Sequence, residues 1–184
     1  MGLALGVALG GSLGRLAELR LRAPWLFLAA IGLQIVAFPV AGLPWRTHET
    51  VASILWVTSY GLLVAAAVLN RRITGVPVVA AGMLLNLVAI LANRGTMPVS
   101  DAAMHDAGRT AVTQANSTAL PDPSLPWLID RWAAPDWVPL ANVYSVGDVV
   151  IAVGAFVIVL AGMGVGRTPL AQDRKPLART SGRA

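Results

Sequence analysis

The sequence lacks cysteine and contains few charged residues. Cysteine is absent, and 12% of the 184 residues are charged while 56% are hydrophobic. Without cysteine the chain has no disulfide framework, no thiolate metal site and no cysteine for lipid attachment. A soluble domain of ordinary composition carries about a quarter charged residues. The low charge therefore indicates a protein that lies in lipid, and we expect it to hold no metal and no cofactor.

The few charges are clustered, which leaves four long uncharged stretches. They cover residues 23–45, 50–70, 73–93 and 149–166. A helix needs roughly 20 apolar residues to cross a bilayer core, and none of these stretches has the polar face of a surface helix. We therefore predict an all-α, polytopic membrane protein with transmembrane helices at about 23–44, 50–70, 74–93 and 147–166.

The first 14 residues are also uncharged, but as a helix they would reach only about 21 Å. They lack the basic start and the small-residue cleavage site of a secretory signal. Glycine recurs at every fourth position, and such a row lets another helix approach closely. These glycines are Gly2, Gly6, Gly10 and Gly14. We predict a short fifth membrane segment over 2–14, either complete or a longer helix shortened by the choice of start codon; a glycine-rich start with little structure is the alternative. Residues 1–166 then form one membrane domain.

Basic residues predict the orientation, because short cytoplasmic loops hold an excess of lysine and arginine. If loops alternate sides, one face holds ten basic residues and the other holds four, together with seven of the nine acidic residues. The ten are Arg15, Arg20, Arg22, Arg71, Arg72, Arg167, Arg174, Lys175, Arg179 and Arg183, and the four are Arg46, Arg94, Arg109 and Arg131. The C-terminus is therefore assigned to the cytoplasm, with 167–184 as a basic, disordered tail beside lipid headgroups. Residues 94–142 are then extracytoplasmic. No basic patch is interleaved with exposed aromatics, so we expect no nucleic-acid partner.

The external segment 94–142 is long for a loop, which suggests a function or partial order. Ser100 is placed to cap a short helix that Gly108 would end. Residues 110–124 are predicted to be flexible. Asn116 opens a glycosylation motif, which matters only in a glycosylating compartment.

A second helix is predicted within residues 124–137, lying in the headgroup layer. Its apolar residues would share one helical face; they are Leu125, Leu128, Ile129 and Trp132. Trp127 and Arg131 are four residues apart, so on this helix they would stack as a cation–π pair.

Uncharged polar side chains lie within the predicted spans, at Gln34, Ser53, Ser59, Asn86 and Asn93. Asn86 and Asn93 share a helical face with Gly82. We expect such residues to form interhelical hydrogen bonds worth about 1 kcal/mol or less each. A substrate path usually carries an ionisable residue deep in a span. No predicted span has one, so transport receives little support.

Asp148 stands at the head of the last uncharged stretch, three residues after Ser145. Ser-x-x-Asp before an apolar run is close to the capping-box pattern, with Asp in place of Glu. The serine would accept a backbone N–H while the carboxylate binds the serine N–H, and the negative charge complements the helix dipole. This interpretation predicts an ionised Asp148 with a structural role.

Three motifs resemble a family of bacterial multi-pass membrane proteins known only as a domain of unknown function. They are "NRGTMPVS" at 93–100, "LIDRW" at 128–132 and "VYSVGDVVIAVGAF" at 143–156, and the similarity runs from Gly11 to Gly166. The resemblance implies a place in the bacterial cytoplasmic (inner) membrane and a first helix longer than the one here. It implies no established activity. Asn93, Gly95, Met97, Pro98 and Ser145 are motif positions that we take as candidate binding residues of unknown role.

A fainter likeness is to lipoprotein signal peptidase (signal peptidase II), an aspartyl protease. Its last helix begins with an Asn-x-x-Asp motif comparable to "YSVGD", and its Asn-x-Gly loop is comparable to that at 93–95. The likeness implies that Asp148 and Asp130 would share one proton and activate water. The motif asparagine is replaced by Tyr144-Ser145, however, and Asp130 lies in a proline-rich external segment rather than at the end of a span. By spacing, Asp136 is an equally available partner.

Two functions therefore stay open. The favoured one is a non-catalytic membrane component that binds a protein or lipid partner through the external segment, with homo-oligomers forming through glycine-rich helix faces, including Gly162-x-x-x-Gly166. The alternative is an intramembrane aspartyl hydrolase that uses Asp148 and Asp130.

Overall fold

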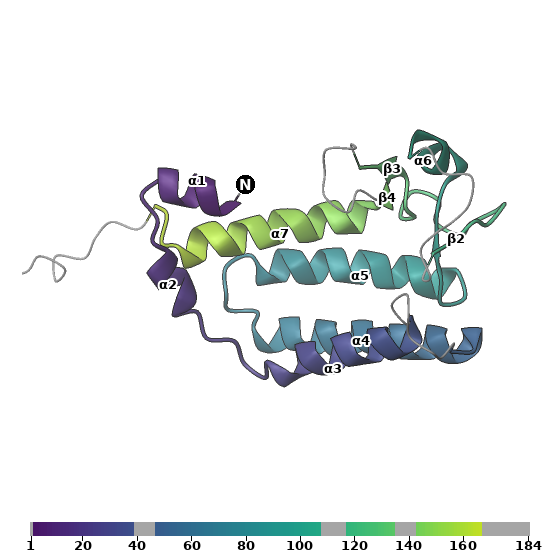
Figure 1. Ribbon diagram of the computed structural model, residues 1–184, viewed down its shortest axis with the longest axis horizontal. Helices are drawn as coiled ribbons and strands as arrows, with labels where there is room; N and C mark the ends of the chain where they lie inside the picture. Colours follow the sequence, from purple (N-terminus) through teal and green to yellow (C-terminus); the bar gives the residue numbers. More distant parts are fainter. Residues whose placement is uncertain (1, 39–46, 108–116, 135–142, 167–184) are drawn as a thin grey trace, which may run out of the picture.

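The computed structural model describes residues 2–38, 47–107, 117–134 and 143–166, and these are mainly helical. Four long helices run side by side (Figure 1): α3 (Trp25–Ala37), α4 (Glu49–Leu69), α5 (Val76–Ala92) and α7 (Val146–Gly162). Three helices are short: α1 (Gly2–Ala8), α2 (Leu13–Ala17) and α6 (Asp101–Asp106). The predicted helical architecture is confirmed for these residues.

The long helices pack in a series rather than around one central axis. α3 packs on α4, α4 on α5, and α5 on α7, while α1 and α2 pack on α7. α5 and α7 pack closely, because glycines face the other helix there. A Cβ at Gly82 would lie 2.5 Å from the Gly147 carbonyl oxygen, and one at Gly154 would lie 2.6 Å from the Val79 nitrogen. Because glycine has no side chain, these positions allow the backbones of α5 and α7 to lie close together.

The helix lengths differ from the predicted spans. Among the described residues α4 alone is both long and apolar enough to cross a membrane, while α3, α5 and α7 are apolar helices of 10–17 residues. α5 covers 76–92 rather than 74–93, and α7 ends at Gly162 rather than Gly166. α3 begins at Trp25 and ends at Ala37, and residues 39–46 lie outside the described part of the chain.

The N-terminal segment forms two short helices instead of one. α1 ends before Gly10, whose φ of +82° suits glycine and breaks the helix. Gly2 and Gly6 face Phe156 of α7 and Met163 directly after it, as a glycine groove requires. Among the described residues nothing lies against Gly10, and only the Ser12 hydroxyl lies near Gly14. The predicted groove is therefore confirmed for its first half and wrong for its second.

The predicted Gly162-x-x-x-Gly166 motif does not lie on one helix. Gly162 is the last residue of α7, and Gly166 lies beyond it with a φ of +77°. Gly162 packs against Leu16 of α2 within the same chain. Homo-oligomerisation through glycine-rich helix faces stays a prediction.

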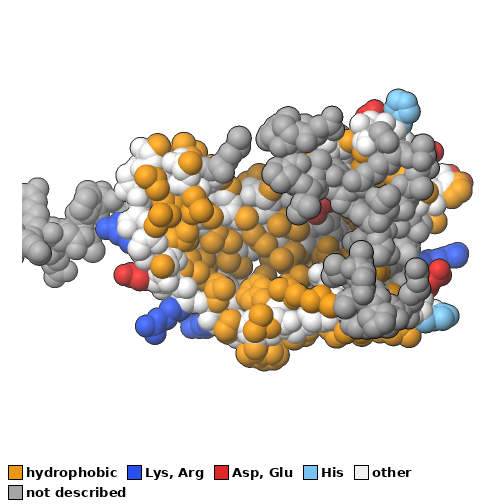
Figure 2. Space-filling model, viewed as in Figure 1, with side chains coloured by type: hydrophobic (Ala, Val, Ile, Leu, Met, Phe, Trp, Pro, Cys, Tyr) orange, Lys and Arg blue, Asp and Glu red, His pale blue; other side chains and the backbone are white. Residues whose placement is uncertain are grey.

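Large apolar side chains are exposed along the sides of the helices, and charges lie at the two ends (Figure 2). One end, here called the arginine end, is where α2, the stretch from α2 to α3 and the α4–α5 connection lie (Figure 1). These segments carry Arg15, Glu18, Arg20, Arg22, Arg71 and Arg72. The other, the acidic end, is where α4 and α7 begin, where α5 ends, and where α6 and the strands lie (Figure 1). These segments carry Glu49, Arg94, Asp101, Asp106, Asp122, Asp130, Arg131 and Asp148, with His48 and His105. The basic excess predicted for one face is thus found at one end of the described structure.

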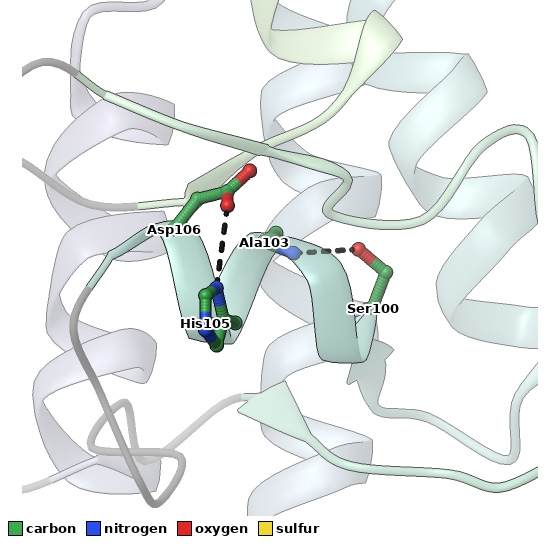
Figure 3. Close-up of polar contacts among 4 residues, drawn as sticks. All are labelled: Ser100, Ala103, His105 and Asp106. Atoms are coloured by element: carbon green, nitrogen blue, oxygen red, sulfur yellow. Dashed lines mark hydrogen bonds and ion pairs between the residues drawn. The ribbon is translucent and has the colours of Figure 1, made fainter.

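The segment after α5 folds over the acidic end. Strand β1 (Met97–Pro98) pairs in parallel with β2 (Ser117–Thr118), and β3 (Trp132–Ala133) pairs antiparallel with β4 (Val143–Tyr144). The α6 N-terminus is capped as predicted, because the Ser100 hydroxyl accepts the Ala103 N–H at 3.2 Å (Figure 3). Predictions for Gly108, Arg109, Asn116, Asp136 and the tail 167–184 fall outside the described residues.

The helix predicted within 124–137 is wrong for the described residues 124–134. Leu125 has a φ of +54° and begins a turn that its carbonyl closes with the Leu128 N–H at 2.8 Å. The chain is then extended, and Asp130 bridges Val99. The backbone hydrogen bonds of this segment therefore go to a neighbouring strand instead of within a helix. Arg131 consequently lies over the Trp132 ring, at 5.8 Å from its centre, and not over Trp127.

Candidate functional site

The N-terminus of α7 carries a complete capping box. The Ser145 hydroxyl accepts the Asp148 N–H at 3.1 Å, and the Asp148 carboxylate accepts the Ser145 N–H at 2.9 Å. Ser145 is fully buried. The structural role predicted for Asp148 is thus confirmed.

Asp148 also binds a residue of α5, which capping does not require. The Asn86 side-chain amide donates to Asp148 Oδ1 at 2.8 Å, and the Asn86 carbonyl oxygen lies 2.8 Å from the Ser145 hydroxyl. Asn86 is buried, and its amide sits against Gly147, where a side chain would collide with it. The helix start and the middle of α5 therefore form one polar cluster, which we call the Asn86 cluster (Asn86, Ser145 and Asp148).

The external segment brings a second carboxyl group to this cluster. Asp130 is 6% exposed, and its backbone is held on both sides: its N–H donates to Pro98 at 3.0 Å, and its carbonyl accepts the Ser100 N–H at 2.9 Å. Burial, and to a smaller extent the negative charge of Asp148, raises the pKa of Asp130 from 3.8 to about 7. The two aspartates are therefore close enough to interact electrostatically.

Helix α4 contributes Tyr60 to the same region. Its side chain lies near those of Asn86, Asp148 and Asp130. Sequence reasoning did not single out Tyr60, because a tyrosine in an apolar stretch carries no local signal. The sequence marks Asn86 only as a polar residue within a predicted span, and no local pattern indicates its partners Ser145 and Asp148.

The other motif residues position the segment that follows α5. Asn93 binds the backbone of Ser124 in both directions, at 2.8 and 2.9 Å. Gly95 has a φ of +86° and lies against Ser53, so a side chain there would be strained and crowded. Met97 and Pro98 are buried on the following strand. These four residues thus hold the external segment in place, and among the described residues none of their hydrogen bonds goes to either aspartate side chain.

The arrangement offers acid–base chemistry. A carboxyl group with a pKa near 7 and a second carboxylate can serve as acid and base at neutral pH. Among the described residues no group of three or more His, Cys, Asp or Glu side chains could hold a metal ion.

A mainly helical protein with a polar site at one end of its helices is the class that this structure defines. Residues 18–160 match the model of a family of unknown function, DUF5317, and the chain belongs to that family. The resemblance to a domain of unknown function is confirmed, whereas the likeness to signal peptidase stays a prediction. No curated protein and no solved structure matches the chain.

Proposed function

We propose that this protein is an integral membrane component whose external segment binds a partner outside the cell. The observation that carries the membrane location is the exposure of large apolar side chains on all four long helices. They include Leu28 at 72%, Ile54 at 59%, Leu91 at 56% and Val153 at 52%. In water such a surface invites aggregation, whereas lipid covers it at no cost.

The lengths of the helices are compatible with a membrane. A helix of 17 residues such as α5 or α7 reaches about 26 Å, and a bilayer thins around short apolar helices at modest cost. The charge asymmetry of the two ends supports an orientation with the arginine end in the cytoplasm and the acidic end outside. In this orientation the tail 167–184 is cytoplasmic.

The absence of cysteine permits a direct test of this orientation. Thr74→Cys and Asp122→Cys place single thiols at exposed positions of the arginine and acidic ends. We expect a membrane-impermeant maleimide to label Asp122→Cys in intact cells and Thr74→Cys only after permeabilisation. The opposite pattern, or recovery of the protein in the soluble fraction, would refute the proposal.

Partner binding is supported by exposed aromatic residues on the external segment. Trp127 is 54% exposed and Trp132 is 41% exposed, with Arg131 stacked beside the latter. Tryptophan and arginine are the residues most enriched at binding hot spots. A photocrosslinking residue at 127 or 132 should yield discrete adducts in cells, whereas the same residue at exposed Asp122 should not. Equal crosslinking at all three positions would indicate collision rather than binding.

An aspartyl hydrolase is the second candidate, because the buried Asp130 lies under the influence of Asp148. Ionised Asp148 would take a proton from water as the water oxygen attacks a peptide carbonyl, while protonated Asp130 would donate its proton to the carbonyl oxygen. As the resulting diol breaks down, Asp148 would donate the proton it took from water to the amide nitrogen and the C–N bond would break. One diol hydroxyl would return a proton to Asp130, and an acid and an amine would be released.

The hydrolase requires both carboxyl groups. Asp130→Asn and Asp148→Asn should each abolish cleavage of a membrane-spanning reporter peptide in detergent, while Asp122→Asn should leave it unchanged. Unimpaired cleavage by either of the first two variants, or no cleavage by the wild type, would remove this candidate.

A further inference from the structure

Asn70 joins two basic segments at the arginine end that lie 48 residues apart in sequence. We propose that these segments form a binding site for the headgroup phosphate of an anionic phospholipid, whose acyl chains lie along α3. The proposal rests on the membrane location proposed above. It adds a preference for one kind of headgroup, which insertion into a membrane does not by itself require.

The two segments are held together from a buried position. Asn70 is the C-cap of α4 and is 4% exposed. Its side-chain carbonyl accepts the Arg22 N–H at 2.7 Å, and its amide donates to the Arg22 carbonyl at 3.0 Å and to the Ala66 carbonyl at 2.8 Å. We call these contacts the Asn70 clamp. One asparagine side chain therefore spans the gap between the backbone of Arg22 and the residue directly before Arg71.

Four arginines flank the Asn70 clamp, and the described part of the protein does not neutralise them. They are Arg20, Arg22, Arg71 and Arg72, and all four are exposed. Among the described residues none of them forms an ion pair, and their guanidinium groups make a single hydrogen bond, from Arg71 to the Val68 carbonyl at 3.2 Å. Like charges held close together repel one another, and a bound anion offsets that repulsion.

The chemistry of these side chains suits a phosphate group. A guanidinium group presents its N–H donors in a fixed fork that binds two phosphate oxygens at once. Arginine has a longer side chain than asparagine, so guanidinium groups from both sides of the clamp can reach one phosphate. Glu18 is the one acidic residue in the described segments at this end, which leaves a net positive charge. The site therefore favours an anionic headgroup over a zwitterionic one, whose ammonium group the arginines repel.

Apolar residues next to the arginines favour a lipid over a free phosphate ion. Leu21, Trp25 and Leu28 are all exposed. Trp25 begins α3, so these residues lead from the basic stretch onto that helix (Figure 1). Tryptophan prefers the boundary between headgroups and acyl chains. A phospholipid covers both parts of this surface, whereas a free ion would leave the apolar part uncovered.

The test is fluorescence quenching of the full-length protein reconstituted into phosphatidylcholine vesicles. A fluorophore is attached to Thr74→Cys, an exposed position two residues after Arg72. It is titrated with phosphatidylglycerol or with phosphatidylcholine, each carrying a nitroxide on the acyl chain near the headgroup, and the two curves give the relative affinity. We expect a preference for phosphatidylglycerol of about fivefold, the size of a favourable exposed ion pair. Inorganic phosphate at constant ionic strength should leave this preference unchanged.

Variants in the same labelled background separate a defined site from general attraction between charges. Arg22→Gln combined with Arg72→Gln should abolish the preference while the Asn70 clamp remains, because Asn70 binds only the backbone of Arg22. Asn70→Ala retains every arginine but loses the clamp, and it should also lower the preference towards one. Arg94→Gln removes an exposed arginine at the acidic end and should keep the preference of the unsubstituted protein.

Equal affinity of the unsubstituted protein for the two lipids would overturn the proposal, and so would an unchanged preference in the double arginine variant or in a folded Asn70→Ala. Displacement of the lipid by inorganic phosphate would assign the site to a free anion instead. If circular dichroism shows that Asn70→Ala is unfolded, the double arginine variant decides alone. Failure of the protein to enter vesicles would refute the membrane location itself, whereas a protein that enters them without a headgroup preference would refute only this site.

Discussion

Asp148 joins two parts of the chain that lie 62 residues apart in sequence, through its hydrogen bond with Asn86. At the scale of the residue, capping and a functional role do not exclude each other. One carboxylate oxygen accepts the Ser145 N–H, while the other accepts the Asn86 amide. The cap fixes the carboxylate in place, and fixed groups are what acid–base or proton-binding sites require.

Ser145→Ala tests the strength of this cluster. The variant removes the N-cap acceptor and the hydroxyl next to Asn86, so we expect the free energy of unfolding to fall by about 1–2 kcal/mol. Thermal or denaturant unfolding followed by circular dichroism would measure it. Ser124→Ala is the matched control, because Ser124 is exposed and binds Asn93 only through its backbone. A Ser145→Ala variant as stable as the control would contradict the role assigned to the cap.

Asp130→Asn tests the raised pKa through overall stability. Because the folded protein holds a proton on Asp130 up to about pH 7 and the unfolded chain releases it near 3.8, wild-type stability should decline as the pH rises through this window. The decline is at most about 4 kcal/mol, at about 1.4 kcal/mol per pH unit. Unfolding free energies at pH 5 and pH 7.5 should therefore differ more in the wild type than in Asp130→Asn. An equal difference in both proteins would show that Asp130 has an ordinary pKa when folded.

At the scale of the element, the glycines between α5 and α7 set the distance that the Asn86 cluster needs. A side chain at Gly82 would meet the backbone of Gly147 and Ile151, which is unable to move aside as a flexible side chain would. The two helices would separate, and Asn86 would leave Asp148. Close backbone contact is thus a condition for the site.

Gly82→Ala should accordingly destabilise the protein by about 1–3 kcal/mol through overpacking. Gly61→Ala is the control in α4, since no described residue would lie within 4 Å of a Cβ at that position. There alanine should be neutral or stabilise by up to about 1 kcal/mol. Unfolding of both variants under one set of conditions gives the comparison. Similar effects of the two substitutions would show that α5 and α7 tolerate a wider spacing.

Local sequence patterns predict the elements whose contacts are local. The bounds of α4 lie within one residue of the uncharged stretch at 50–70, and Ser-x-x-Asp predicts the capping box at 145–148. The apolar spacing at 125–132 predicts a helix that does not form, because this segment pairs with residues far away in sequence. The Asp130–Val99 bridge and the Asn86–Asp148 bond join distant segments, and no local period encodes them. Most of the site was therefore not predictable from periodicity.

At the scale of the whole molecule, an open series of helices leaves much apolar surface uncovered. Helices that surround a common axis bury their apolar sides against one another. Here α3 contacts α4 and α4 contacts α5, so the sides of the series face outward, with apolar side chains over them (Figure 2). The charges are confined to the ends, as expected if the sides face lipid.

Val153→Lys distinguishes lipid from water around these sides. Val153 lies near the middle of α7 and is 52% exposed. An exposed position in water tolerates lysine within about 0.5 kcal/mol, whereas lysine at the centre of a membrane helix costs roughly 3 kcal/mol. We therefore expect Val153→Lys to lower the amount of protein recovered from membranes. Ala92→Lys, at the exposed last residue of α5, should have little effect, because a lysine at a helix end reaches the headgroups. Equal yields of the two variants in the membrane fraction would mean that lipid does not surround α7.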